Sequence, residues 1–250
     1  MGQLVKVAVA GGIATITLDS PANRNALSQQ LLADLHSSLD AAEQAGARAI
    51  VLTHSPPVFC AGADLKERAA GNVDSTSFVR AIERIGQTPA PVVAAVDGPV
   101  RAGGIGLMAA CDLVVVNSAI TFAFTEVRIG VAPAIVTAPI LQRCGWSKLA
   151  SPYLTGEEFD AAAALDMGLV THVVHDVAAT VAELTRKLLL GGPQALAATK
   201  RLLRRPHTVH ELQAISESLF TSEEGREGMA AFAEKRAPRW TEGRGQGSSR

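Results

Sequence analysis

Residues 57–65 read PVFCAGADL, and a second glycine turn, Gly103-Gly104, follows later in the chain. Each turn lies between an apolar, strand-like run and a helix-like run. Glycine turns of this kind leave backbone N–H groups unpaired and able to point into a cleft. Two such donors that converge on one oxygen form an oxyanion hole, which stabilises negative charge on a carbonyl or thioester oxygen. Either turn alone is more typical of simple turn geometry, so the interpretation depends on the pair and its context.

Composition argues against several classes of protein. The chain has 250 residues, of which 48% are hydrophobic, and its formal net charge is −1. This length is enough to bury a full core. With 4% aromatic residues the chain has few stacking platforms for single-stranded nucleic acid. It also has no basic block to follow a phosphate backbone. We therefore expect no nucleic-acid partner.

The cysteines and the N-terminus bear on location. Cys60, Cys111 and Cys144 are too few and too scattered for a disulfide framework or a zinc site, which favours a reducing, cytoplasmic compartment. Residues 1–10 lack the basic-then-apolar pattern of a signal peptide. No apolar run approaches the ~20 residues that a membrane span needs. The sequence predicts a soluble intracellular protein without a membrane partner.

Strand-like and helix-like segments alternate through the first two thirds of the chain. Gly11-Gly12 separates two strand-like runs, as in a β-hairpin, and Ser28 is a good N-cap for a helix with leucines at helical spacing. The alternation predicts an α/β fold with several ββα units. The expected strands cover 4–10, 13–18, 49–53, 92–96 and 113–116, and the expected helices 28–45, 77–87 and 104–110, with a loop over 98–103.

The last third of the chain is nearly all helical in pattern, apart from a strand expected over 169–174. Helices are expected over 177–190, 193–204, 209–221 and 223–234. Between the first two, Gly191-Gly192-Pro193 makes a sharp break with proline in the first turn of a helix. We predict a catalytic core over 1–190, a helical C-terminal or oligomerisation segment over 191–242, and a disordered tail over 243–250.

Five motifs, in the right order, resemble the crotonase superfamily, which is the enoyl-CoA hydratase/isomerase group. The resemblance covers nearly the whole chain and implies a crotonase-like (ββα)n superhelix core with a C-terminal all-helical segment. The motifs are NRNAL at 23–27; FCAGAD at 59–64; PVVAAVDG at 91–98 with GG at 103–104 and CD at 111–112; LTG at 154–156 with the alanines of 161–164 and GLV at 168–170; and EGMAAF at 227–232 with KRAP at 235–238.

By this resemblance, the backbone amides of Ala63 and Gly103 bind the thioester oxygen of an acyl-CoA. Removing a proton next to a thioester makes an enolate, and losing one donor to its oxygen costs about 10²–10³-fold in rate. Arg24 or Lys66 is available to a phosphate of coenzyme A. Coenzyme A belongs to the substrate, so we expect no separate cofactor and no metal. The residues assigned to substrate and CoA binding are Arg24, Ala26, Ala61, Ala63, Asp64, Leu65, Lys66, Gly103 and Gly104.

The acid/base group separates the possible reactions. In hydratases of the family two glutamates hold the attacking water; here the first position falls on Gly106 and the second on Glu126. Adding water needs oriented water and a delivered proton, work naturally shared between two groups. Moving a double bond needs one base, which takes a proton from C2 and returns it to C4. The resemblance therefore implies Glu126 as the catalytic group and favours isomerisation, as in family Δ3,Δ2-enoyl-CoA isomerases of the mitochondrial type.

Other interpretations stay open. Glu126 alone could serve an enoyl-CoA hydratase or a lyase, since single-glutamate lyases acting on hydroxycinnamoyl-CoA exist in the superfamily. A non-catalytic acyl-CoA-binding homologue is a further alternative. Residues 104–109, GIGLMA, satisfy the dinucleotide pattern G-x-G-x-x-A, but 97–103 separates them from the preceding strand, which argues against NAD binding. Cys60 and Cys111 are expected in the core rather than as nucleophiles.

Four charged residues near the motifs have less specific roles. Arg101 is expected in a surface salt bridge rather than against an acyl carboxylate. Glu67 is expected to face solvent rather than the cleft. Asp64 and Asp112 are expected to serve turns or caps.

The leucines at 188, 189, 196, 202 and 203 are ordinary core or subunit-contact positions. Family members commonly assemble as trimers paired into hexamers, with C-terminal helices packed between subunits. The resemblance therefore implies a homotrimer or hexamer.

Overall fold

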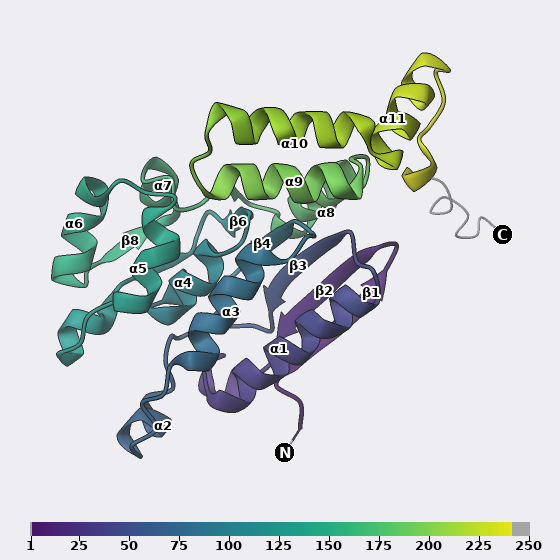
Figure 1. Ribbon diagram of the computed structural model, residues 1–250. Helices are drawn as coiled ribbons and strands as arrows, with labels where there is room; N and C mark the ends of the chain where they lie inside the picture. Colours follow the sequence, from purple (N-terminus) through teal and green to yellow (C-terminus); the bar gives the residue numbers. More distant parts are fainter. Residues whose placement is uncertain (1, 242–250) are drawn as a thin grey trace.

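A computed structural model describes residues 2–241, and within them the main sheet has six strands (Figure 1). The strand order is β1-β2-β3-β4-β6-β9. The β1–β2 pair is antiparallel and the other pairs are parallel. All residues of β4 are buried, as is typical of a parallel strand covered on both faces. The strands are β1 (Val5–Ala10), β2 (Ile13–Leu18), β3 (Ala49–His54), β4 (Val92–Val96), β6 (Leu113–Asn117) and β9 (His172–Val174).

Helices cover both faces of this sheet. Val93 and Ala95 of β4 pack with Val177 and Val181 of α8 (Val177–Leu188). The alternate residues of β4 face the larger core, because successive strand residues point to opposite faces. That core is covered by α1 (Gln29–Gln44), α3 (Thr76–Gln87), α4 (Gly103–Ala109) and α5 (Ala134–Leu141). The other helices of the body are α2 (Leu65–Ala69), α6 (Trp146–Thr155) and α7 (Ala161–Asp166), with 3-10 turns η1 (Pro21–Asn23) and η2 (Thr125–Ile129).

A second, three-stranded sheet consists of β5 (Val100–Arg101), β7 (Thr121–Ala123) and β8 (Glu158–Asp160). β5 pairs in parallel with β7, with Val100 opposite Phe122, and β7 pairs antiparallel with β8. The loop expected over 98–103 therefore contains a strand, and that prediction was wrong. Its pairing partner lies in a distant part of the sequence, which local composition does not report.

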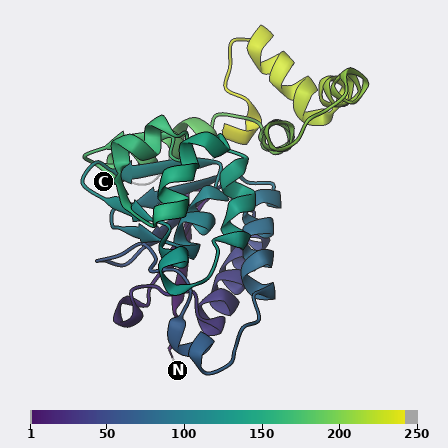
Figure 2. The same cartoon turned by 90° about the vertical axis from the view of Figure 1, so that its left-hand side faces the viewer.

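The C-terminal segment consists of α9 (Pro193–Arg204), α10 (Val209–Thr221), α11 (Glu223–Ala233) and η3 (Arg239–Thr241). α9 lies against the body, whereas α10 and α11 project from it (Figure 2), and α10 has no buried residue. The bounds expected for α9 and α10 are confirmed. The tail expected over 243–250 lies outside the described residues. Within 2–241, no helix is long and apolar enough to cross a membrane.

Most other expected elements are present. β1 and β2 form the hairpin, and Ser28 Oγ caps α1 by accepting from Leu31 N at 3.2 Å. The strand expected over 169–174 is shorter in the structure, where β9 covers His172–Val174. Sequence analysis did not predict α2, α5, α6, β7 or β8.

Candidate active site

The first glycine turn presents a backbone amide without an acceptor. The turn passes Gly62 at φ +90°, and Gly62 O accepts a hydrogen bond from Leu27 N at 2.8 Å. A trans peptide holds its C=O and N–H on opposite sides, so the N–H of Ala63 points away from Leu27. Within residues 2–241 this N–H donates to no acceptor.

The second glycine turn also presents a backbone amide without an acceptor. Ala102 has φ 48° and ψ −121°, an uncommon conformation for a residue with a β-carbon and one that concentrates at functional sites. Ala102 N donates to Ala123 O at 3.0 Å, and Ala102 O accepts from Ile105 N at 2.9 Å. The N–H of Gly103 points away from Ala102 O and begins α4, where helix amides lack intrahelical partners. It has no acceptor in the described part of the chain.

The two turns are in direct contact. A β-carbon added at Gly62 would lie 2.8 Å from Ala102 Cβ and 3.3 Å from Gly103 N. One added at Gly103 would lie 3.7 Å from Ala63 N. Glycine at 62 thus satisfies both a positive φ and a close approach of backbone. The unpaired amides of Ala63 and Gly103 lie on neighbouring segments, an arrangement that suits one shared oxygen acceptor.

A buried asparagine fixes the loop that precedes α1. Asn25 is fully buried, and its Nδ2 donates to Val58 O at 2.8 Å. Asn23 Nδ2 donates to Asp64 Oδ2 at 3.3 Å, so the loop is tied to the first glycine turn at two points. No separate role was predicted for Asn25, because its role depends on the burial of a polar side chain, which the sequence does not show. Arg24, between the two asparagines, is exposed.

The expected CoA-binding residues gather around this loop. Ala61 N donates to Arg24 O at 3.0 Å, and Ala26 is buried beside it. Leu65 and Lys66 are exposed at the start of α2. Asp64 Oδ1 accepts from Lys66 N at 3.0 Å, which confirms the capping role. Arg24 and Lys66 are thus exposed cations on two connected segments.

Glu126 and Gly103 each follow a strand of the second sheet, at the same edge of that sheet. β5 runs into the Gly103 turn, and its parallel neighbour β7 runs into η2, which carries Glu126. Glu126 Oε2 is buried and has no hydrogen-bond partner among residues 2–241. Burial raises the pKa of this carboxyl group, and its own backbone amide lowers the pKa by a smaller amount. A carboxylate of this kind suits proton transfer near neutral pH.

Val136 occupies the space beside Gly106. A β-carbon added at Gly106 would lie 2.6 Å from Val136 Cγ1, 2.8 Å from its Cβ and 3.1 Å from its Cα. Gly106 lies in α4 and Val136 in α5, so these two helices are in contact where the first family glutamate is expected. The residue at 106 cannot be enlarged without moving α5.

Arg101 and Glu67 each have partners within the protein. Arg101 Nη2 pairs with Glu158 Oε1 at 2.9 Å, and Arg101 Nη1 donates to Thr121 O at 2.7 Å. The expected salt bridge is confirmed. Glu67 Oε2 accepts from Gln29 N at 3.0 Å, so it holds the first turn of α1 instead of facing solvent, and that prediction was wrong.

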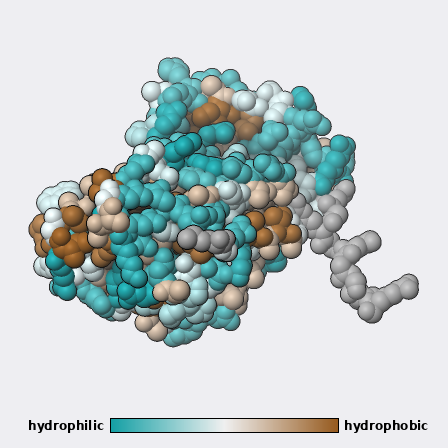
Figure 3. Space-filling view, turned by 90° about the horizontal axis from the view of Figure 1, so that it is seen from below, coloured by the Kyte–Doolittle hydropathy of each residue, from teal (hydrophilic) through white to brown (hydrophobic). Residues whose placement is uncertain are grey.

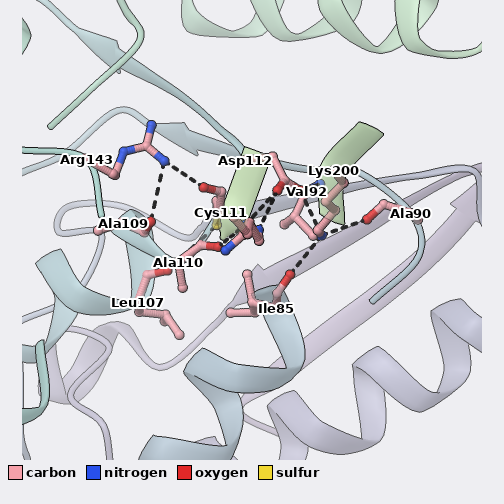
Figure 4. Close-up of polar contacts among 11 residues, drawn as sticks. Ile85, Ala90, Val92, Leu107, Ala109, Ala110, Cys111, Asp112, Arg143 and Lys200 are labelled. Atoms are coloured by element: carbon pink, nitrogen blue, oxygen red, sulfur yellow. Dashed lines mark hydrogen bonds and ion pairs between the residues drawn. The ribbon is translucent and has the colours of Figure 1, made fainter. Parts of the chain in front are cut away.

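Asp112 anchors the C-terminal segment to the end of α4 (Figure 4). Its carboxylate pairs with Lys200 Nζ at 2.8 Å and with Arg204 Nη2 at 2.6 Å, both from α9, and accepts from Val92 N at 2.7 Å. Arg143 Nη1 donates to Cys111 O at 2.8 Å. The expectation that Asp112 serves a turn or cap was therefore incomplete, because its main partners come from α9.

Within residues 2–241, no group of three or more His, Cys, Asp and Glu side chains could hold a metal ion. Burial raises the pKa of the Cys60 and Cys111 thiols to about 12 each, so both are core residues. Cys60 Cβ would lie 2.7 Å from a β-carbon at Gly104.

Comparison with known proteins identifies the family of the chain. The sequence profile described as Enoyl-CoA hydratase/isomerase matches residues 8–244. An enoyl-CoA hydratase from Mycobacterium avium, solved by crystallography, is 41% identical with a TM-score of 0.74 and covers 96% of this chain and 100% of its own. An enoyl-CoA hydratase/isomerase from Marinobacter aquaeolei is 28% identical with a TM-score of 0.88 over 96% and 100%.

A curated relative, the enoyl-CoA isomerase/hydratase of Mycosarcoma maydis, is 30% identical over 92% of this chain and 93% of its own length. The match of the family profile spans most of the chain, and the fold and the order of the motifs agree with it. The chain belongs to the enoyl-CoA hydratase/isomerase family, the crotonase superfamily.

Proposed function

We propose that this protein moves the double bond of an enoyl-CoA thioester from C3 to C2. Glu126 takes a proton from C2 of the 3-enoyl chain, and the electrons delocalise onto the thioester oxygen. The same carboxyl group then returns the proton to C4, which leaves the 2-enoyl product and regenerates the carboxylate. Atoms and charges balance without a cofactor or a metal.

The amides of Ala63 and Gly103 stabilise the dienolate oxygen in this proposal. Both N–H groups lack acceptors among residues 2–241, and the turns that carry them are in contact. Preformed donors need no reorganisation when charge develops, which is why they stabilise a transition state more than a ground state. Arg24 and Lys66 are placed to meet the phosphates of coenzyme A.

The packing of Val136 against Gly106 is the observation that carries the choice of isomerisation. A second carboxylate at 106 has no room, so one group must both accept and return the proton. The raised pKa of Glu126 supports this role, because a carboxylate with a raised pKa is a stronger base for the C2 proton.

Hydration is the second candidate. Relatives whose names include hydratase support it. In hydration a water molecule adds across the double bond, and another side chain would have to help Glu126 orient that water. Cleavage of a hydroxyacyl-CoA and simple acyl-CoA binding remain weaker alternatives, because the buried and unpaired Glu126 carboxylate suits proton transfer.

Rates on two substrates test the proposal. A short 3-enoyl-CoA reports isomerisation and a 2-enoyl-CoA reports hydration, each measured with the wild type, Glu126→Gln and Glu83→Gln. Glu83 is an exposed glutamate of α3 and serves as the matched control. We expect the wild type to isomerise its substrate faster than it hydrates the other. Glu126→Gln should lose the isomerisation activity, and Glu83→Gln should keep it. Faster hydration would reject isomerisation as the main activity, and turnover that survives Glu126→Gln would reject the assigned base.

We also propose a homo-oligomer, a trimer or hexamer, that buries the C-terminal segment. Phe220 and Phe232 are 63% and 87% exposed, and α10 has no buried residue. Apolar residues also gather at the end of the body that carries α6 (left in Figure 3), where Leu154 of α6 is exposed. Light scattering should give a mass of three or six chains, and Phe232→Glu should reduce it. A monomeric wild type would contradict the proposal.

A further inference from the structure

His54 joins the two chain segments that lead to the proposed oxyanion amides. It is the last residue of β3, and its Nε2 accepts a hydrogen bond at 3.1 Å from Asp97 N, which follows β4. Its Nδ1 lies 3.2 Å from Ser55 O. A backbone N–H can only donate, so Nε2 carries no proton, and Nδ1 carries the proton that Ser55 O accepts. The two contacts therefore define His54 as a neutral imidazole in one tautomer.

Beyond this contact the two segments run side by side toward the unpaired amides. Phe59 N donates to Pro99 O at 3.1 Å, and Arg101 N donates to Cys60 O at 3.0 Å. On each segment the unpaired amide follows these contacts within three residues. The hydrogen bond of His54 is the first cross-link of this series and is made by a side chain that titrates.

The space around the His54 ring is tight. A β-carbon added at Gly98 would lie 2.5 Å from Pro57 O and 3.0 Å from His54 Cε1. The ring also meets Phe59 edge-on, with centroids 5.5 Å apart, and Phe59 is fully buried. The imidazole thus has little room to turn away from Asp97 unless the backbone around it moves.

Protonation of His54 would end its contact with Asp97. The added hydrogen at Nε2 would face the Asp97 N–H, which is itself a donor, so the hydrogen bond cannot persist. Burial has the largest effect on the pKa of His54 and lowers it. The Ser55 carbonyl, the Asp97 carboxylate and the Val58 carbonyl each raise that pKa by a smaller amount. The imidazole is therefore an acceptor at neutral pH, and acid converts it into a donor.

The charged groups beside His54 are the carboxylates of Asp97 and Asp19. Asp97 Oδ1 accepts from Asn117 Nδ2 at 2.7 Å. Asp19 pairs with Lys6 and accepts from the hydroxyl group of the residue after His54. Each carboxylate therefore has a partner of its own. The contact with Asp97 N is lost on protonation, whichever carboxylate then accepts from the imidazolium.

We infer that His54 is a positioning residue, whose neutral imidazole keeps the two oxyanion segments in register and whose protonation loosens them. It acts through the amides of Ala63 and Gly103 rather than on the substrate. The inference rests on the oxyanion hole proposed above and deepens it, because it adds an acid-sensitive group besides Glu126. Acid then removes the base at Glu126 and also displaces the amides that stabilise the enolate oxygen.

Two substitutions separate the hydrogen bond from the packing. His54→Phe keeps a ring against Phe59 but removes the acceptor for Asp97 N. His54→Gln offers an amide oxygen in place of Nε2, and this acceptor does not titrate. His36→Gln is the matched control, because His36 is also half-buried and its Nε2 lies 3.0 Å from a backbone carbonyl, that of Ser77.

Infrared spectra of bound butyryl-CoA, isotopically labelled at the thioester carbonyl, report the oxyanion contacts without turnover. Hydrogen bonds from two amides weaken the C=O bond, so we expect binding to the wild type to lower its stretching frequency. This lowering should shrink in His54→Phe, return in His54→Gln and stay unchanged in His36→Gln. The full lowering in His54→Phe would overturn the inference and leave the oxyanion hole standing. No lowering in the wild type, or no binding, would reject the oxyanion hole and the inference together.

Kinetics add a pH readout. In the proposed isomerisation we expect kcat to fall about ten-fold in His54→Phe with a smaller change in KM, because misplaced amides weaken the transition state most. His54→Gln should recover most of this loss at neutral pH. As pH decreases, the rate of the wild type should fall more steeply than that of His54→Gln, since both Glu126 and His54 become protonated. Equal slopes in the two proteins would overturn the inference.

Nuclear magnetic resonance tests the contact itself without a ligand. The resonances of the His54 ring and the Asp97 amide should shift together as pH decreases, with a midpoint below the pKa of an ordinary histidine. The Asp97 amide should lose this response in His54→Gln and keep it in His36→Gln. An Asp97 amide that does not follow the His54 ring would overturn the inference whatever the isomerase assay shows. A shared titration supports it even if hydration proves faster than isomerisation, because both reactions use the same amides.

Discussion

Gly106 and Val136 are in such close contact that a β-carbon added to the glycine would lie 2.6 Å from Val136 Cγ1. The contact joins α4, which begins at the proposed oxyanion amide, to α5, which follows the Glu126 turn. It explains in physical terms why position 106 lacks a side chain. The proposed site is therefore built around one carboxylate.

Gly106→Glu should destabilise the protein because the side chain must displace Val136. We expect a loss of about 1–3 kcal/mol in the free energy of unfolding, as for other overpacked cores, measured by urea denaturation. Gly106→Glu with Val136→Ala should recover part of this loss and raise the ratio of hydration to isomerisation. A single variant as stable as the wild type would show that the space is open.

Gly62→Ala should damage catalysis more than its effect on backbone strain explains. Gly71 has a similar φ of +92° and no atom within 4 Å of an added β-carbon, so Gly71→Ala is the matched control. Both variants strain the backbone, but the clash with Ala102 arises at position 62 alone. We expect kcat/KM to fall about 10²-fold or more in Gly62→Ala and to stay near wild type in Gly71→Ala. Equal effects would reject the contact between the turns.

The rate should depend on pH through Glu126. The base must be ionised to take the C2 proton, and burial raises the pKa of Glu126. We therefore expect kcat/KM for isomerisation to fall as pH decreases, with its midpoint above the pKa of an ordinary glutamate. A profile that stays flat down to the ordinary value would contradict an elevated pKa.

The same shift makes a prediction about stability. Because the folded-state pKa is raised, the folded protein binds the Glu126 proton more tightly than the unfolded chain does, and this contribution is lost as pH rises through the folded pKa. Glu126→Gln removes the charged form, so its Tm should exceed that of the wild type at neutral pH. The difference should disappear below the unfolded-state pKa. A Tm difference of the opposite sign would show that the Glu126 charge is stabilised in the fold.

Asp112→Asn should loosen the attachment of the C-terminal segment. It leaves Lys200, whose side chain is 4% exposed, without its carboxylate partner, and breaking a buried pair costs about 3–5 kcal/mol. Glu183→Gln on α8 removes exposed ion pairs with Arg186 and Lys187 and should cost much less, because solvent screens exposed charges. Chemical denaturation compares the two. Equal losses in the free energy of unfolding of the two variants would contradict the role of Asp112 as an anchor.

Regular elements with local signals were predictable from sequence. The cap at Ser28, the proline that opens α9 and the apolar run of β4 each act through residues close in the chain. The second sheet was missed because β5, β7 and β8 are short and are stabilised by partners far away in sequence. Position in the fold, not local pattern, makes them strands.

The residues of the proposed site also divide into those with a local sequence signal and those without one. The motifs identified the glycine turns and Glu126, since each has a sequence signature. Val136 has none, because its significance lies in its contact with Gly106. Asn25 belonged to a motif, but its role depends on burial, which the sequence did not show.

A crystal structure with bound butyryl-CoA tests the central claim most directly. The account predicts that the thioester oxygen lies within about 2.7–3.1 Å of both Ala63 N and Gly103 N, with a Glu126 carboxylate oxygen beside C2. A thioester oxygen that contacts neither amide, or a Glu126 side chain turned away from C2, would contradict it.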